Sequence, residues 1–265
     1  MIATLDELAA ALVQAQSFPL RKNSFTLAAN QTVDLFHMGD GFPPNAPVTA
    51  SGLNGEFMDN TKAGAIPFKD SLIGATTNVG RISMIATLSN LFAIADRIWN
   101  NFVDMAAAGT AKQDIAWPSG VQRYADGVGV ELYASVTTAL ANATPATWTV
   151  EFINQNDELQ VATASYAGSG EVGQMIPFDL PAGSTGVKSL VSFQASVAQA
   201  AGGIELVLCK RILDLPLVNF VPSFQDGITL GLPQVQPGAC LFMMSFRTAN
   251  GATPVLNGKL DIVQG

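Results

Sequence analysis

Residues 84–108 carry the longest helical pattern of hydrophobic positions in the chain. Their apolar side chains recur at alternating steps of three and four, the spacing that places side chains on one face of a helix. This row consists of Ile85, Leu88, Phe92, Ala95, Trp99, Phe102 and Ala106. The pattern predicts one long amphipathic helix. Its packing residues are expected to be Ile85, Leu88, Phe92, Trp99 and Phe102.

A second apolar row widens this face, while the polar residues collect on the opposite side. The second row is Met84, Leu91, Ile98 and Met105. Three apolar positions per heptad exceed what a two-stranded coiled coil needs. Two interpretations remain open. The helix packs inside a β-sandwich of its own chain, or it packs against the same helix of other subunits about a symmetry axis. Replacing Trp99 by Asp separates them, because it should unfold the monomer in the first case and release folded monomers in the second.

From residue 128 onward the hydrophobic positions alternate with polar ones, the period-two pattern of β-strands. Turn signals rich in Gly, Pro, Asn and Asp separate the segments. The predicted strands are 128–136, 148–152, 159–166, 175–180, 188–197, 204–213, 217–221, 240–248 and 255–263. The pattern predicts a mainly β protein whose C-terminal part is an antiparallel β-sandwich, jelly-roll-like in topology.

The N-terminal part has a different character. Thr4 and Glu7 have the spacing of a capping box at the start of a short helix that extends to about residue 16. Residues 39–80 then contain frequent breakers and no long periodic element, which is typical of an arm that wraps a neighbouring subunit. We therefore expect three parts: a helix and docking arm (1–80), the long helix and a connector (81–127), and a β-sandwich module (128–265).

Composition narrows the range of functions. Charged residues make up only 13% of the 265 residues, against about 25% in typical soluble domains. The net charge is −8, and no cluster of Lys and Arg occurs, which disfavours nucleic-acid binding. No apolar run is long enough for a membrane span, and Asp6 and Glu7 interrupt the only candidate leader. We expect a protein made in the cytoplasm, with a bland surface that tolerates burial in an assembly.

The two cysteines, Cys209 and Cys240, fall on different faces of their predicted strands. Cys240 shares a face with Phe242 and Met244, whereas Cys209 shares one with Glu205. We expect one thiol to point into the core and the other away from it. The pattern favours two reduced thiols over a disulfide.

Three glycines and the histidine are candidates for a ligand-binding or catalytic site. Gly168, Gly170 and Gly173 match the letters of a dinucleotide fingerprint, but Pro177 follows too soon for the helix that such a site needs. They are better explained as a hairpin loop. His37 is the only histidine and could be a general base or a metal ligand. Without candidate partners, a hydrogen-bonded structural histidine is favoured.

Two further groups of residues could bind a ligand: the oxygen-bearing side chains of one turn, and four aromatic side chains at separate positions. The oxygen-rich run from Asn154 to Glu158 could bind calcium, but it lacks the spacing of an EF-hand and is favoured as a hairpin turn. The aromatic candidates for glycan stacking or for a subunit interface are Trp117, Tyr124, Tyr133 and Tyr166. No catalytic, cofactor-binding or metal site is predicted.

Four C-terminal segments resemble tailed-bacteriophage virion proteins of the decoration, cement, neck or fibre kind. The segments are TWTVEFINQNDE (147–158), GVKSLVSFQASV (186–197), GIELVLCKRIL (203–213) and ACLFMMSFRT (239–248). The resemblance is general, and the segments contain no motif that is diagnostic of these proteins. It implies a non-enzymatic virion protein that forms homo-oligomers, often trimers, and bridges capsid or tail subunits. The alternatives are a carbohydrate-binding module in host recognition and a jelly-roll hydrolase.

Overall fold

The computed structural model describes residues 2, 4–23, 25, 30–47, 55–70, 75–118, 123–141, 144–168, 170–247 and 254–265. Antiparallel strands dominate it, which confirms the mainly β prediction. The described helices are α1 (Leu5–Val13), α2 (Met105–Ala108) and α3 (Gly227–Leu230). None of these has the length and apolar character needed to cross a membrane.

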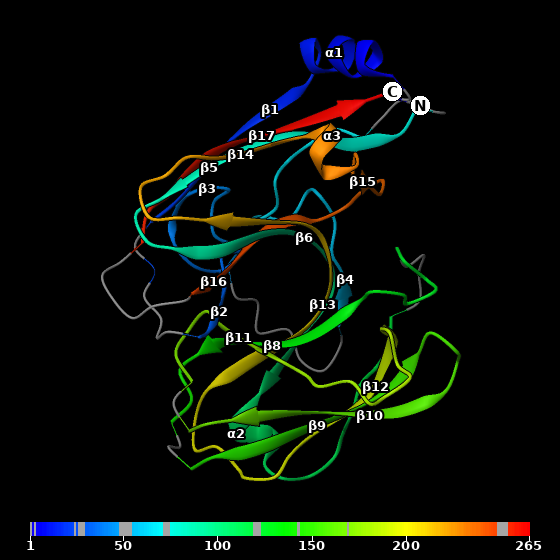
Figure 1. The fold of residues 1–265 in the computed structure, drawn as a ribbon. Helices are drawn as coiled ribbons and strands as arrows, with labels where there is room; N and C mark the ends of the chain where they lie inside the picture. The colour runs from blue at the N-terminus through cyan, green and yellow to red at the C-terminus, as the bar shows by residue number, and fades with distance from the viewer. Residues whose placement is uncertain are drawn as a thin grey trace.

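Six strands close into a ring at the centre of the molecule (Figure 1). In ring order they are β13 (Gly203–Leu217), β8 (Glu131–Thr138), β11 (Gln174–Pro177), β2 (Thr32–Asp34), β16 (Leu241–Arg247) and β6 (Asn90–Asp104). Because β6 also pairs with β13, the sheet has no free edge along this path. We call this arrangement the closed sheet. The short strand β4 (Glu56–Phe57) is added on β6.

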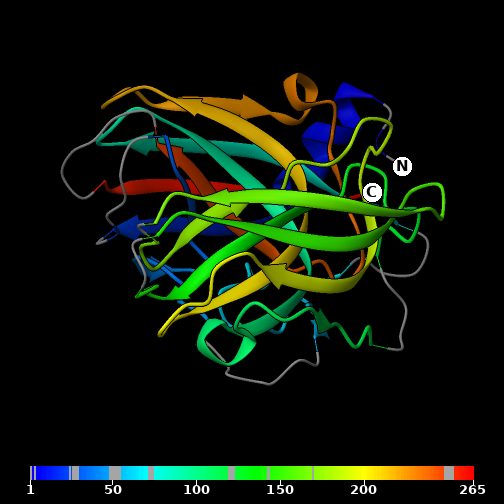
Figure 2. The ribbon, with the colours of Figure 1, turned by 90° about the horizontal axis from the view of Figure 1, so that it is seen from below.

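Two further sheets flank the closed sheet on opposite sides (Figures 1 and 2). The upper sheet has the order β14 (Ser223–Asp226), β5 (Thr77–Ala86), β17 (Leu256–Gln264), β1 (Gln16–Asn23) and β3 (Asp40–Phe42), with β15 (Gln234–Val235) on β5. The lower sheet has the order β10 (Leu159–Tyr166), β9 (Ala146–Asn154), β12 (Val187–Ala195) and β7 (Gln113–Asp114).

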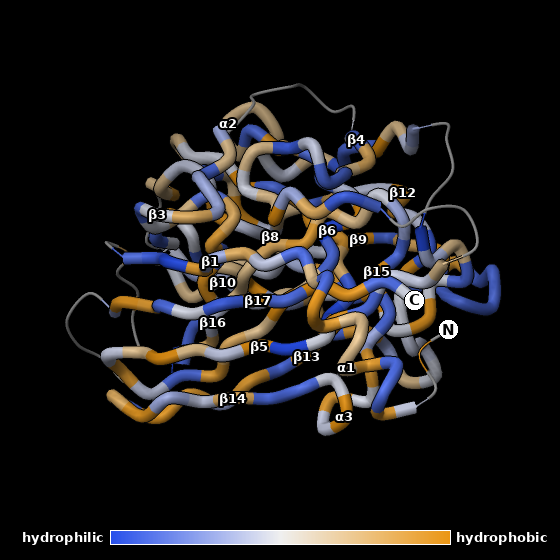
Figure 3. The backbone as a smooth tube through the Cα atoms, turned by 90° about the horizontal axis from the view of Figure 1, so that it is seen from above, coloured by the Kyte–Doolittle hydropathy of each residue, from blue (hydrophilic) through white to orange (hydrophobic). Residues whose placement is uncertain are grey.

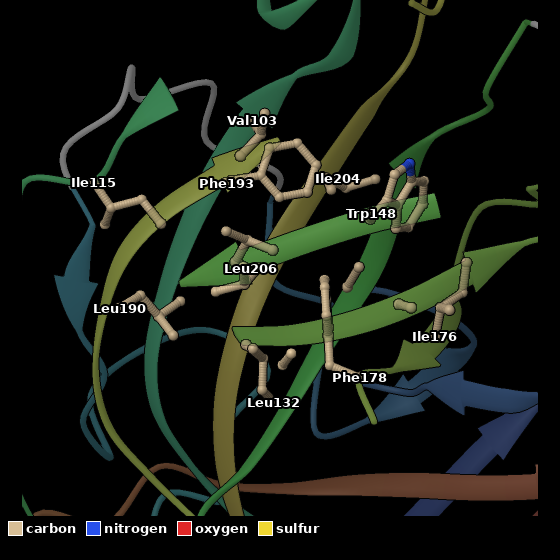
Figure 4. Close-up of a cluster of buried hydrophobic side chains, with 14 of the residues drawn as sticks. Val103, Ile115, Leu132, Trp148, Ile176, Phe178, Leu190, Phe193, Ile204 and Leu206 are labelled. Atoms are coloured by element: carbon tan, nitrogen blue, oxygen red, sulfur yellow. The ribbon is translucent and has the colours of Figure 1, made fainter. Parts of the chain in front are cut away.

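Three hydrophobic clusters fill the spaces that this arrangement creates. One lies between the upper and closed sheets and includes Ile82, Ile94 and Leu260. The cluster between the lower and closed sheets includes Trp148, Phe193 and Leu206, shown in Figure 4. The third contains side chains from the interior of the closed sheet, among them Val207, Phe242 and Met244. The long strands β6 and β13 contribute to all three.

The predicted long helix at 84–108 is wrong. These residues form the end of β5, the whole of β6 and the short helix α2. One face of β6 points into the closed sheet and the other packs on the flanking sheets, so nearly every side chain is buried. A strand buried on both faces loses its period-two alternation and can imitate a helical pattern.

The five predicted packing residues of that helix therefore lie on strands and their connection. Phe92 and Trp99 are fully buried on β6, in the upper and lower clusters respectively. Phe102 is half-buried on the same strand. Ile85 on β5 and Leu88 in the turn that follows are half-buried as well.

Other local predictions are confirmed. Thr4 and Glu7 form the capping box of α1, and the strand predicted at 159–166 is β10. The predicted strand 204–213 lies within β13, but 217–221 is not a strand of its own, because only Leu217 of that segment belongs to β13 and the strand ends there. The jelly-roll arrangement is not confirmed, because the predicted strands are distributed between the closed sheet and both flanking sheets. Residues 1–80 contribute β1, which pairs with the C-terminal strand β17.

The prediction for the cysteines needs one correction. Cys209 and Cys240 are both buried, and both are free. The predicted faces are right, but both faces lie toward the interior of the closed sheet, because Glu205 on the face of Cys209 is itself buried. The charge of Glu205 was therefore wrongly taken to mean that the face of Cys209 is exposed to solvent.

Candidate functional site

Arg97 lies at the centre of the closed sheet with none of its side chain exposed. Its Nη1 donates to Oδ2 of Asp34 at 2.9 Å, and its Nη2 donates to Oε2 of Glu205 at 2.5 Å. The three residues come from β6, β2 and β13. One guanidinium therefore holds together strands that are far apart in the sequence.

Two aromatic rings enclose the same guanidinium. The Arg97 Cζ atom is 4.5 Å from the centroid of the Phe36 ring and 5.5 Å from that of Phe242. Attraction between the cation and the ring faces stabilises a charge that has left water. Arg97 Nε has no hydrogen-bond partner among the described residues. The rings therefore compensate only part of the cost of burial.

His37 extends the network toward the surface. Its Nε2 lies 2.9 Å from Oε2 of Glu205, and its Nδ1 lies 3.1 Å from the carbonyl oxygen of Ala46. Both partners are acceptors, so both bonds are satisfied only when the imidazole carries two protons. Burial acts to lower the pKa of His37, but the hydrogen bond to Glu205 and the charge of Asp34 outweigh it and raise the pKa above 6.5.

The two buried carboxylates stay ionised. Burial acts to raise the pKa of Glu205, but the hydrogen bond from His37 and the charge of Arg97 lower it to about 2. Burial opposes ionisation of Asp34 in the same way, and Arg97 again lowers the pKa of that carboxyl. Asp34 Oδ2 also accepts from the Ser135 hydroxyl at 2.6 Å. Two anions thus share the guanidinium of Arg97.

A cavity of about 150 Å³ adjoins His37 and Glu205. Its apolar lining consists of Phe36, Ala46, Pro47, Met58 and Ala63. Asn100 contributes a buried amide, and the ion pair between Lys62 Nζ and Glu56 Oε2, 2.7 Å apart, stands at the half-exposed rim. The cavity therefore combines apolar walls with a polar end.

The network as a whole fits structural stabilisation better than proton transfer. Each ring nitrogen of His37 already faces an acceptor oxygen of the protein, so neither is open to a proton from a substrate. Over the described ranges, no group of three or more His, Cys, Asp or Glu side chains is arranged to hold a metal ion. The alternative preferred for His37, a hydrogen-bonded structural histidine, agrees with this geometry.

Two predicted loops also have structural roles. Gly168 and Gly173 have positive φ, and the segment that follows them is the strand β11, not a helix. The Asn154 Oδ1 atom accepts from the backbone nitrogens of Asn156 and Glu158, which fixes the hairpin between β9 and β10. The Asn154 motif is a hairpin turn, as the sequence favoured, but the glycine motif is a loop that leads from β10 in the lower sheet to β11 in the closed sheet and is not a hairpin.

The four predicted aromatic candidates do not gather on one surface. Trp117 stacks on Trp99, and buried Tyr166 stacks on Trp148, with ring centroids 4.8 and 5.2 Å apart. Half-buried Tyr133 donates its hydroxyl to Glu131, and the ring of Tyr124 lies below Lys210 Nζ. The contacts of these rings are with other parts of the same chain.

Sequence reasoning missed Arg97 and Glu205. A signal existed: each is a charged residue inside a strongly apolar run, IADRIW and GIELVL. A charge in such a position is buried and needs a partner, because burying it alone is costly. Reading 84–108 as a helix placed Arg97 on a solvated face, which hid this signal.

No protein-family model matches the sequence, and no curated protein matches it. Among solved structures, the VP2 subviral particle of infectious bursal disease virus aligns with 94% of this chain and 80% of its own, at 6% identity and a TM-score of 0.21. The structure of the Gt strain of the same virus aligns over 94% and 81%, at 10% identity and a TM-score of 0.16. TM-scores this low do not indicate a common fold.

Proposed function

We propose that this protein is a non-enzymatic structural protein of a bacteriophage virion, of the decoration, cement or minor structural kind. It would act by binding copies of itself and neighbouring capsid or tail subunits. The style of the C-terminal segments and the low charged fraction support the class of protein. The surface described next supports binding as its mode of action.

Exposed apolar side chains concentrate on one short segment, and this observation carries the proposal. Of the eleven large hydrophobic residues that are exposed in the described chain, five lie within residues 218–228. They are Val218, Phe220, Val221, Phe224 and Ile228. A soluble monomer rarely gathers exposed apolar groups in this way, whereas interaction sites do. We call residues 218–228 the apolar edge segment.

This segment includes the outermost strand of the upper sheet, β14, which carries Phe224, and the other four exposed residues flank that strand. β14 pairs with β5 on one side only. Figure 3 shows β14 along the margin of the sheet, with hydrophobic chain at both of its ends. Unpaired strand edges bind other strands or are covered in assemblies. Apolar side chains and an open strand edge thus occur at the same place.

The test is association in solution. We expect native mass spectrometry and light scattering to show homo-oligomers of the wild-type protein. A Val221→Ser/Phe224→Ser variant should raise the dissociation constant by at least about tenfold, since buried apolar anchors dominate interface energies. The matched control is Leu159→Ser/Val161→Ser on β10, whose side chains are similarly exposed. That variant should associate like the wild type.

The virion role needs a separate measurement. Mass spectrometry of gradient-purified particles from the source virus should find peptides of this chain at a fixed ratio to the major capsid protein. A strictly monomeric protein that is absent from particles and binds no capsid or tail component would overturn the proposal.

A further inference from the structure

We propose that the cavity beside Glu205 binds a small uncharged molecule that has an apolar body and one N–H or O–H donor. This inference goes beyond the structural role proposed above and does not depend on it. It rests on an unpaired acceptor, on the apolar walls and on the charge balance of the lining residues.

The unpaired acceptor belongs to Asn100, which lines the cavity and is 7% exposed. Its Nδ2 donates to Oε2 of Glu205 at 3.1 Å, and this contact fixes the orientation of the amide because a carboxylate can only accept. Oδ1 is buried and has no hydrogen-bond partner among the described residues. A buried acceptor without a donor is costly, so a bound donor would stabilise the protein.

The cavity has the size and the walls for a compact apolar body. Its volume of about 150 Å³ matches that of an engineered protein cavity that binds benzene. Phe36 and Met58 provide large apolar surfaces, and Ala46, Pro47 and Ala63 complete the wall. A ring of six carbon atoms with one polar substituent therefore fits the space.

The lining residues favour a ligand without net charge. Glu205 is paired with Arg97 and lies 2.9 Å from His37 Nε2, while Arg97 is also paired with Asp34. At the rim, Glu56 and Lys62 form their own ion pair. A charged ligand would lose its hydration without gaining a free counter-ion. An uncharged donor avoids this cost.

The experiment compares phenol with benzene, which share a ring but differ in the O–H donor. Binding to the full-length protein is measured by NMR titration. For the wild type we expect phenol to bind about tenfold more tightly than benzene, the ratio that one added hydrogen bond supplies. In Asn100→Leu this ratio should fall to about one, while benzene still binds and reports an intact cavity.

Two further variants separate the cavity from general effects on the fold. Asn101→Leu removes the neighbouring buried amide, which likewise has no hydrogen-bond partner in the described parts of the chain but does not line the cavity. This variant should keep the tenfold ratio. Ala63→Phe places a ring from an exposed position at the mouth and should abolish binding of both ligands. Absence of binding to the wild type, equal affinities for phenol and benzene, or loss of the ratio in Asn101→Leu would overturn the proposal.

Discussion

His37 Nε2 lies 2.9 Å from Glu205 Oε2, although 168 positions separate the two residues in the sequence. The contact joins the loop after β2 to the beginning of β13, at the point where Arg97 and Asn100 also reach the same carboxylate oxygen. Since each partner shifts the pKa of the other, the contact makes the stability of the fold depend on pH.

The His37→Gln variant should reveal this dependence. The pKa of His37 is raised in the folded state, so its protonation stabilises the fold fully below about pH 6.5 and ceases to do so as the pH rises through the raised pKa. Below pH 6.5 the variant should lose roughly 1.5–3 kcal/mol, the usual contribution of a hydrogen bond to a charged group. Urea unfolding over a pH series measures the difference between the two proteins.

Glu205 sets the acid limit of the same experiment. Its pKa is lowered from 4.5 to about 2, so its contribution is present above pH 4.5 and is lost as the pH falls toward 2. The stability difference between wild type and His37→Gln should therefore shrink on both sides of a plateau. A difference that stays constant from pH 3 to above pH 8 would show that the pair is not coupled.

Arg97→Met should be among the most destabilising substitutions. It leaves Asp34 and Glu205 buried without their shared cation, and breaking a buried pair in this way costs about 3–5 kcal/mol. The matched control is Arg211→Met, because Arg211 also contacts two carboxylates but is 42% exposed. Exposed pairs contribute about 0–1 kcal/mol. Similar losses for both variants in chemical denaturation would contradict the role assigned to Arg97.

Trp99→Asp should abolish folding of the monomer. Trp99 is fully buried on β6 and stacks on Trp117, so the variant loses about 3–5 kcal/mol of packing and buries a charge without a partner. Near-ultraviolet circular dichroism should show no fixed tertiary structure. Phe224→Asp, at a position 58% exposed, should keep the native spectrum. Folded monomers of Trp99→Asp would restore the interpretation that this residue packs between subunits.

Cys209 and Cys240 should be unreactive until the protein unfolds. Both thiols are free and buried, and burial raises the pKa of each, which suppresses the reactive thiolate. A thiol reagent should label neither in the native protein and both after denaturation without reductant. Rapid labelling of the native protein would contradict the burial, and a missing thiol after denaturation would indicate a disulfide.

Local signals predicted those elements whose two faces meet different environments. β10 alternates exposed and buried side chains because the lower sheet has a solvent face, and its predicted bounds agree with the structure. The capping box of Thr4 and Glu7 depends only on residues close in the sequence, so it too could be predicted. β6 has no solvent face, and its burial on both sides removed the pattern on which prediction relies.

The candidate site was out of reach for a different reason. Arg97, Glu205 and the neighbouring pair of Asp34 and His37 lie on three separate segments, and closure of the central sheet brings these segments together. Pattern and spacing describe neighbours along the chain, not pairing across a ring. Charged residues within the apolar runs IADRIW and GIELVL indicate that buried partners exist. The sequence does not identify those partners.

Closure of the central sheet also limits the order in which the parts of the protein can fold during synthesis. β16 lies between β2 and β6, and it is made after every other strand of the ring. The lower sheet is built from residues 113–195 alone, so all its strands have been synthesised while β2 and β6 still lack their common neighbour. On the ribosome, the lower sheet can therefore form early. The ring, with Arg97 and Asp34 on either side of β16, can close only after residue 247 has been synthesised.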